Sequence, residues 1–223
     1  CDLLLIVRGE LSWIISRLRI AGSCADAAAI LRIAPQSKGA CMGSFANEPR
    51  PALTHRLADA HDAGEIARLY VEGWQHLLAE HQVPMLPAGT RVDDHERRWR
   101  SDLLNRSSRS GAMLALADHH AVGLCAWRPA SDGDGEAELI GFHLEKAYRG
   151  HHEGRRLLDA TYTAIRAMGY STVVVWMWFS ALEVRRYLER HGFRASGERR
   201  GIEIGQPLHE VRLSRPLIED LPF

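Results

Sequence analysis

The sequence predicts an α/β fold in which helices flank a mixed, mostly antiparallel, twisted sheet that contains one central parallel pair of strands. Three patterns lead to this prediction. Residues 61–81 have the apolar period of a helix, residues 112–127 form two apolar runs joined by a polar turn, and residues 137–179 follow the order strand, helix, buried strand. The last order is typical of a right-handed βαβ unit with parallel strands.

The length and composition of the chain exclude several classes of protein. The chain has 223 residues, which suits one domain with an extension. Hydrophobic residues make up 46% and charged residues 25%, which excludes collagen-like, wholly disordered and multi-span membrane chains. Lys and Arg number 28 and so do Asp and Glu, so the net charge is zero and nucleic acid is a poor candidate partner.

The cysteines give no sign of a metal site or of a disulfide framework. They are Cys1, Cys24, Cys41 and Cys125, and no two of them form a CxxC pair. We therefore expect no metal ligands and a reducing, cytoplasmic location.

Residues 3–22 are the one candidate for a signal or membrane segment. Charged residues interrupt every apolar run well before the length needed to cross a bilayer: Arg8, Glu10, Arg17 and Arg19. The segment is either an amphipathic helix resting on the domain or a stretch upstream of the natural start, and we favour the second because the first methionine is Met42. The expected organisation is an extension and linker at 1–53, a domain at 54–217 and a tail at 218–223.

Two helices are expected at the start of the domain. The first covers 61–81, with Asp59 as its N-cap. Its inward stripe contains Ile66, Leu69, Tyr70, Gly73, Trp74 and Leu77. Pro84 and Pro87 separate it from a second helix over 93–104, which begins with two acidic residues. One side of that helix carries Trp99, Leu103 and Leu104.

An antiparallel hairpin is expected next. Its strands cover 112–117 and 121–127, and the polar residues between them predict a turn. His119 and His120 are better explained as solvated turn residues than as ligands, because adjacent residues of a strand point to opposite faces.

The βαβ unit and a closing hairpin complete the fold. The unit contains a strand, a helix and a strand at 137–145, 153–168 and 172–179. The second strand is apolar from Val173 to Trp178, as expected of a strand covered on both faces. A ligand site is expected beyond the carboxyl end of the first strand, at 148–154. A helix at 181–191 and a hairpin turning around 201–207 follow.

Several motifs occur in one order and with matching spacing. The most specific is ELIGFHL at 138–144 followed by YRGHHEGRRLL at 148–158, and the supporting motifs are VGL at 122–124, VW at 175–176 and YLERHGF at 187–193. Together they resemble the GNAT superfamily of N-acetyltransferases over residues 54–217. The resemblance implies that the parallel pair is the family's fourth and fifth strands, and that 148–158 is its pyrophosphate loop and third helix.

The resemblance implies acetyl-coenzyme A as the co-substrate, with its pyrophosphate in the loop 149–155. A strand that feeds a helix through a glycine-containing turn directs backbone N–H groups and the positive end of the helix at one spot, which suits a pyrophosphate. In the family pattern Q/R-x-x-G-x-G/A, Arg149 and Gly154 match the outer positions, whereas His152 replaces the middle glycine. A Cβ at this position obstructs the approach of the backbone to phosphate, and Glu153 adds a negative charge, so weaker cofactor binding is expected.

Ten residues make up the cofactor site that the resemblance implies: Phe142, His143, Leu144, Arg149, Gly150, His151, His152, Glu153, Gly154 and Arg155. Phe142 aligns with the residue whose backbone N–H polarises the acetyl carbonyl, a role that does not depend on its side chain. The basic residues nearby either compensate for the replaced glycine electrostatically or are simply solvated: His151, His152, Arg155 and Arg156.

The resemblance also implies two catalytic residues. Glu138 stands where many family members carry the acid that takes the proton from the incoming amine, directly or through water; the alternative is a rim carboxylate paired with an arginine. The family's usual general acid, a tyrosine, aligns with Leu188, and Tyr187 lies one residue early. A one-residue step turns a helical side chain by about 100°, so Tyr187 either serves through a local shift or is a core aromatic. Ala181 replaces an asparagine common at the start of that helix.

The sequence therefore predicts an N-acetyltransferase that moves an acetyl group from acetyl-coenzyme A to a primary amine by direct attack. The rival is a domain that keeps the fold without the chemistry and acts as a coenzyme A sensor or structural partner. The acceptor is a small-molecule or peptide amine, and the helices that shape its site in the family offer residues that hint at a cation: Trp74, His76, Asp93, Asp94 and Glu96. Homodimers are frequent in the family, and the sequence leaves the oligomeric state open.

Overall fold

The computed structural model describes residues 5–6, 52–80, 91–105, 108–131, 135–203 and 207–217. Its strands are β1 (Leu5–Ile6), β2 (Thr54–Leu57), β3 (Gly111–Ala117), β4 (His120–Pro129), β5 (Glu136–Leu144), β6 (Thr172–Trp178), β7 (Arg194–Glu203) and β8 (Pro207–Pro216). Its helices are α2 (Ala63–Glu80), α3 (Val92–Leu104), α4 (Glu153–Ala167) and α5 (Leu182–Arg190), with short 3-10 turns η1 (Ala60–Asp62) and η3 (Lys146–Tyr148).

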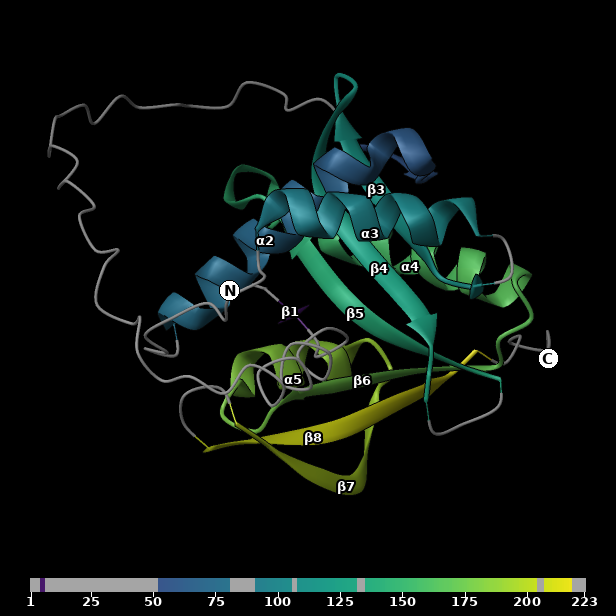
Figure 1. Ribbon diagram of the computed structural model, residues 1–223. Helices are drawn as coiled ribbons and strands as arrows, with labels where there is room; N and C mark the ends of the chain where they lie inside the picture. Colours follow the sequence, from purple (N-terminus) through teal and green to yellow (C-terminus); the bar gives the residue numbers. More distant parts are fainter. Residues whose placement is uncertain are drawn as a thin grey trace, which may run out of the picture.

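The strands form one mixed sheet. Their order is β2-β3-β4-β5-β6-β8-β7, and β1 pairs with β5 outside that order. β5 and β6 pair in parallel, whereas the other neighbouring strands in the described ranges pair antiparallel. The predicted fold class, a mostly antiparallel twisted sheet with a central parallel pair and flanking helices, is confirmed (Figure 1).

Helices cover both faces of the sheet (Figure 1). On one face, here called the α2 face, α2 and α3 bury Ile66 and Trp99 against Leu114 of β3. On the opposite face, the α4 face, α4 and α5 contribute Leu157 and Leu188 to a second apolar cluster. The sheet therefore separates two cores, and each strand residue belongs to one face or the other.

Asp59 caps the first helical segment, as predicted, although the segment begins as a 3-10 turn. Its carboxylate accepts a hydrogen bond from the His61 backbone N–H at 2.7 Å, and Asp62 accepts one from the Asp59 backbone N–H at 2.8 Å. This capping box holds η1, which leads directly into α2, so α2 starts two residues later than predicted. Leu104, predicted on the same side of the helix as Trp99, is 68% exposed, because five residues turn a helix to about 140° from the starting face.

The predicted hairpin is confirmed in β3 and β4. Ala117 pairs with His120 across a two-residue turn, Asp118-His119. Both turn residues have positive φ, 46° and 74°, as a hairpin turn whose twist matches its strands requires. His119 and His120 are exposed, as expected of turn residues.

β5 and β6 diverge after a short parallel pairing. Glu136–Glu138 pair with Thr172–Val174, and the ladder stops there. Opposite Ala126 and Trp127 of β4, β5 then contains one extra residue, Ile140, which forms a β-bulge. A bulge bends its strand and increases its twist. The carboxyl halves of the parallel strands are therefore separated, and one edge of β5 is left open to other partners.

β1 and residues 52–53, of which Leu53 is buried in the core, are the described parts of the expected N-terminal extension and linker. β1 lies on the edge of β5, where Leu5 pairs with Phe142 and Ile6 pairs with Gly141. Residues 7–51, most of the expected extension and linker, and the expected tail at 218–223 lie outside the described residues, so the predicted boundaries stay predictions. Of the helices in the described ranges, none has the length and apolar character to cross a membrane.

Cys125 of β4 is the one cysteine within the described residues. Its side chain is fully buried between the sheet and α4. Burial raises the pKa of its thiol to about 12, so the sulfur stays protonated and unreactive at neutral pH.

Candidate active site

A pocket of 420 Å³ opens at the carboxyl end of β5, where the strand order predicts a ligand site. Its walls come from the end of β5, the following loop, the first turn of α4 and one side of α5. The lining residues are Phe142, Leu144, Arg149, Gly150, His152, Gly154, Arg155, Tyr187, Arg190 and His191. All but the last two are predicted site residues.

The loop between β5 and α4 is tied back to the strand. Arg149 donates a hydrogen bond from Nε to the Leu144 carbonyl oxygen at 2.7 Å, which fixes the start of the loop. Gly150 has a φ of +93° and needs the freedom of glycine there. The loop delivers the backbone to α4, whose first N–H groups have no acceptor within the helix. The pocket therefore meets the positive end of α4.

His152 occupies the N-cap of α4 in a left-handed conformation. Its φ is 63° and its ψ is 4°, and its side chain makes no capping hydrogen bond. This region strongly favours glycine, so a histidine here strains the backbone. The departure predicted at this position is thus a conformational feature as well as a steric one.

Tyr187 lines the pocket and also packs against the apolar cluster of the α4 face. Its ring stacks on that of Phe142, with centroids 6.2 Å apart, and a Cβ placed on Gly154 would lie 3.0 Å from its hydroxyl oxygen. Leu188, the residue that aligns with the family's tyrosine, is fully buried. Burial raises the pKa of Tyr187 to about 12, so its hydroxyl carries a proton at neutral pH. α5 starts at Ala181 without a side-chain cap.

Two lining residues, Arg190 and His191, were not predicted. His191 packs on the Tyr187 ring with centroids 4.1 Å apart, and its Nδ1 lies 2.8 Å from the Tyr187 carbonyl oxygen. Both residues follow Tyr187 by three or four positions and so share its side of the helix. Once Tyr187 is placed in a pocket, that spacing identifies the other two.

Three predicted cofactor residues do not line the pocket. Glu153 is buried and accepts a hydrogen bond from Arg156 at 2.8 Å, so its charge is paired with a guanidinium. His151 is exposed, with Nδ1 3.3 Å from the Arg149 carbonyl oxygen. His143 is buried, and burial, with the Arg149 charge as the next cause, lowers its pKa to about 4.

A comparison with protein-family models matches residues 74–193 to the acetyltransferase (GNAT) family. The chain belongs to that family. The match spans β3 to β6 and α4 to α5 and so includes β5, α4 and α5, the elements that line the pocket. A comparison with curated proteins finds no match.

Solved GNAT structures share the fold at low identity. The yncA protein of Salmonella typhimurium, solved with acetyl-CoA, is 17% identical with a TM-score of 0.58, and the match covers 78% of this chain and 98% of that one. The PaiA N-acetyltransferase of Thermoplasma acidophilum, in complex with coenzyme A, is 13% identical with a TM-score of 0.59, and the match covers 74% of this chain and 99% of that one. The ribosomal-protein-alanine N-acetyltransferase of Brucella melitensis is 16% identical with a TM-score of 0.58, and the match covers 74% of this chain and 99% of that one.

Glu138 of this GNAT chain lies where the parallel pair separates, on the α2 face. Its side chain is 3% exposed, and Oε2 accepts two hydrogen bonds from Arg128, from Nη2 at 2.7 Å and from Nε at 3.0 Å. Oε1 is buried and has no hydrogen-bond donor among the described residues, and Arg200 Nη2 is 4.0 Å away. Glu138 is thus paired with arginine but buried, unlike a carboxylate at a solvent-exposed rim.

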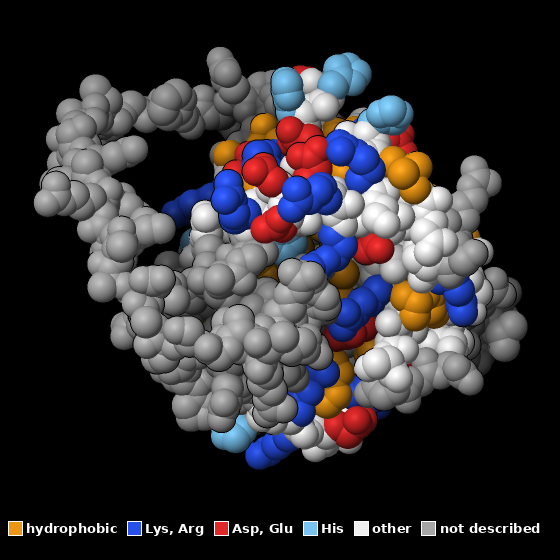
Figure 2. Space-filling view, viewed as in Figure 1, with side chains coloured by type: hydrophobic (Ala, Val, Ile, Leu, Met, Phe, Trp, Pro, Cys, Tyr) orange, Lys and Arg blue, Asp and Glu red, His pale blue; other side chains and the backbone are white. Residues whose placement is uncertain are grey.

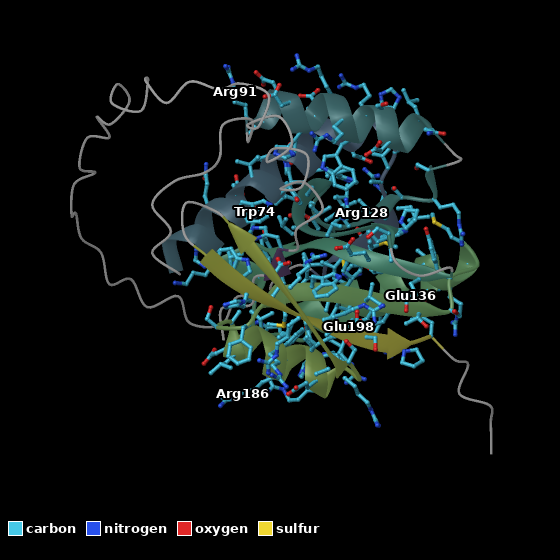
Figure 3. The ribbon with its side chains drawn as sticks, turned by 60° about the horizontal axis from the view of Figure 1, so that its bottom comes forward. Trp74, Arg91, Arg128, Glu136, Arg186 and Glu198 are labelled. Atoms are coloured by element: carbon cyan, nitrogen blue, oxygen red, sulfur yellow. The ribbon has the colours of Figure 1, made fainter. Side chains whose placement is uncertain are left out.

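The residues expected to shape the acceptor site of a GNAT enzyme do not gather into one. Trp74 is buried and packs edge-on against Tyr70, 6.5 Å between ring centroids. The carboxylates of α3 pair with arginines of the same segment: Asp93 with Arg91, Asp94 with Arg97, and Glu96 with Arg100. Figure 3 shows Arg91 at the outer side of α3. These groups therefore give no support to a cationic acceptor.

Proposed function

We propose that the protein transfers an acetyl group from acetyl-coenzyme A to a primary amine by direct attack. The observation that supports this most is the pocket at the end of β5, because it combines the carboxyl end of that strand, the amino-terminal end of α4 and the protonated Tyr187 hydroxyl. Two structural neighbours hold acetyl-CoA or coenzyme A. The pocket offers the same kind of ligand an anion site at α4 and an apolar wall at Phe142 and Leu144.

Different parts of the pocket contact the pyrophosphate and the acetyl group of the cofactor. The backbone N–H groups after His152 bind the pyrophosphate, with Arg149 and Arg155 adding positive charge at the mouth. The Phe142 backbone N–H polarises the acetyl carbonyl. Gly154 leaves the space that brings the Tyr187 hydroxyl close to the helix.

The reaction forms one bond and breaks one. The amine nitrogen attacks the acetyl carbon, the carbon–sulfur bond breaks, and the products are an amide and coenzyme A. Glu138 receives the proton that the amine loses, through a water molecule on Oε1, because Arg128 already holds Oε2. Tyr187 gives a proton to the departing thiolate, which is a tolerable leaving group even without help because a thiol has a pKa of about 8.5.

Release of free coenzyme A from acetyl-coenzyme A, measured over a panel of primary amines, tests the proposal. We expect release that depends on an amine and yields the acetylated amine by mass spectrometry. Calorimetry with coenzyme A on the same protein distinguishes an active acetyltransferase from a domain that only binds coenzyme A as a sensor. Binding without turnover on any amine would favour the sensor, and absence of binding would contradict the site itself.

A further inference from the structure

Four charged side chains form a row across the α2 face. Arg128 of β4 pairs in register with Glu138 of β5, and Arg200 of β7 pairs in register with Glu210 of β8. We call these four residues the charge row. Arg200 reaches from β7 across β8 and over Trp176 of β6 toward Glu138. Figure 3 shows Arg128 on this side of the sheet, and Figure 2 shows basic, acidic and hydrophobic side chains together in the hollow below α2 and α3.

Glu210 and Trp176 hold the Arg200 side chain in place. Its Nε donates a hydrogen bond to Glu210 Oε2 at 2.6 Å, and Glu210 is buried. Its guanidinium lies on the Trp176 ring, 4.0 Å from Cζ to the ring centroid. These contacts hold the flat guanidinium in one orientation, so little freedom is left to lose when it binds a ligand.

The outer edge of the same guanidinium makes no hydrogen bond to a described residue. Nη2 is 4.0 Å from Glu138 Oε1, which is too long for a hydrogen bond. No hydrogen-bond acceptor among the described residues meets Nη1 or Nη2 of Arg200, and 28% of its side chain is exposed. Two parallel N–H groups on one guanidinium edge are the geometry that binds a carboxylate with two hydrogen bonds.

The charges of the row alternate and cancel. Arg128 and Arg200 are positive, Glu138 and Glu210 are negative, and each carboxylate lies beside a guanidinium. The row as a whole attracts neither a net cation nor a net anion. A ligand with a positive and a negative group a few bonds apart matches it, because its amine faces Glu138 while its carboxylate faces Arg200.

We propose that the acceptor is an amino acid whose carboxylate is bound by the Nη edge of Arg200 while its amino group faces Glu138. The inference rests on the proposed function and names the substrate class of that site. Arg200 is then a specificity-determining residue supplied by the carboxyl-terminal hairpin. A peptide amino terminus or a simple amine lacks the nearby carboxylate and is a poor acceptor.

The first test changes the ligand and leaves the protein intact. Wild-type protein saturated with coenzyme A is titrated by calorimetry with the standard L-amino acids and with their carboxamides, and the same pairs are tried as acceptors. We expect at least one free amino acid to bind about 10- to 100-fold more tightly than its amide, the size expected of charge-assisted hydrogen bonds. Equal binding of acid and amide would overturn the inference.

The second test changes the protein. Arg200→Gln and Arg200→Lys should each raise KM for the free amino acid about 10-fold or more and leave the value for the amide unchanged, so the preference for acid over amide is lost. Arg199→Gln is the matched control, because Arg199 is exposed, neighbours Arg200 on the opposite face of β7 and lies over Phe179. A parallel loss on acid and amide would mean that Arg200 is only structural.

The two proposals fail in different ways. Turnover with simple amines but with no free amino acid would overturn the inference and leave the acetyltransferase proposal intact. Binding of free amino acids that needs Arg200, without turnover, would support the inference and contradict the catalytic proposal.

Discussion

At the scale of single residues, the strain at His152 has the clearest consequence. A left-handed histidine at a helix N-cap costs about 1 kcal/mol or more relative to glycine, and the same residue borders the pocket. Stability and ligand binding are therefore linked at one position, and removing the side chain should improve both.

We expect His152→Gly to raise the melting temperature and to tighten coenzyme A binding about tenfold, which corresponds to about 1.4 kcal/mol. Calorimetry and thermal unfolding of both proteins measure the two effects. His151→Gly is the matched control, because His151 is exposed in the same loop and its φ is not positive. If the His152 variant binds more weakly, the steric argument is wrong.

Glu138 gives a second prediction at this scale. Glu138→Gln should lower kcat by about 10²- to 10⁴-fold with little change in coenzyme A affinity, as expected for loss of a general base. The residual rate should rise with pH, because more amine arrives without its proton. Glu136→Gln on the same strand, which pairs with Arg212, serves as control and should keep most activity. An unchanged rate in the Glu138 variant would leave Glu138 as a structural partner of Arg128.

At the scale of elements, the edge of β5 is the feature on which the site depends. The bulge at Ile140 and the early end of the parallel ladder leave the carboxyl half of β5 without pairing to β6. β1 contributes one residue pair at each of Phe142 and Gly141 on that edge. The remaining strands pair with one another without β1, so the sheet does not depend on it.

We expect that residues 1–41 can be deleted, with the chain starting at Met42, without loss of folding or activity. The two pairs made by β1 are few beside the ladders of β3 to β8, and they occupy the edge next to the acetyl site implied at Phe142. Thermal unfolding and coenzyme A titration of both chains measure the effect. A melting temperature several degrees lower, or aggregation of the short chain, would show that the segment is part of the domain.

Local pattern predicts the elements that are periodic and long, and fails where tertiary contacts decide. β2 was not predicted, because its four residues show no alternation and are mostly exposed; it is defined by pairing with β3. The register of the carboxyl-terminal hairpin, which brings Arg200 near Glu138, cannot be deduced from spacing in the chain. Tyr187 likewise depends on how α5 is rotated, since Leu188 takes the core position.

At the scale of the whole molecule, buried neutral histidines link stability to pH. Burial is the main cause that lowers the pKa of His143 to about 4, and it also lowers the pKa values of His95 and His55. In the unfolded chain these groups titrate near pH 6.5. Between pH 6.5 and 4 the unfolded chain therefore binds more protons than the folded one, and stability falls as pH falls.

We expect the free energy of unfolding to decrease from pH 6.5 toward pH 4, with a shallower slope in His143→Gln. Denaturant unfolding at several pH values measures the slope. His120→Gln, at an exposed turn position, is the control and should follow the wild-type curve. Equal slopes in the His143 variant and wild type would mean that His143 does not contribute to the pH dependence of stability.

Because Cys125 is buried, a disulfide dye can detect the thiol of released coenzyme A without reacting with the folded protein. In a chain that starts at Met42, Cys125 is the only cysteine, and its thiol is buried and protonated. A dye that reacts with exposed thiolates should then colour only with the coenzyme A set free by turnover. In the absence of substrate, a slow appearance of one equivalent of colour would instead time the opening of the core between the sheet and α4.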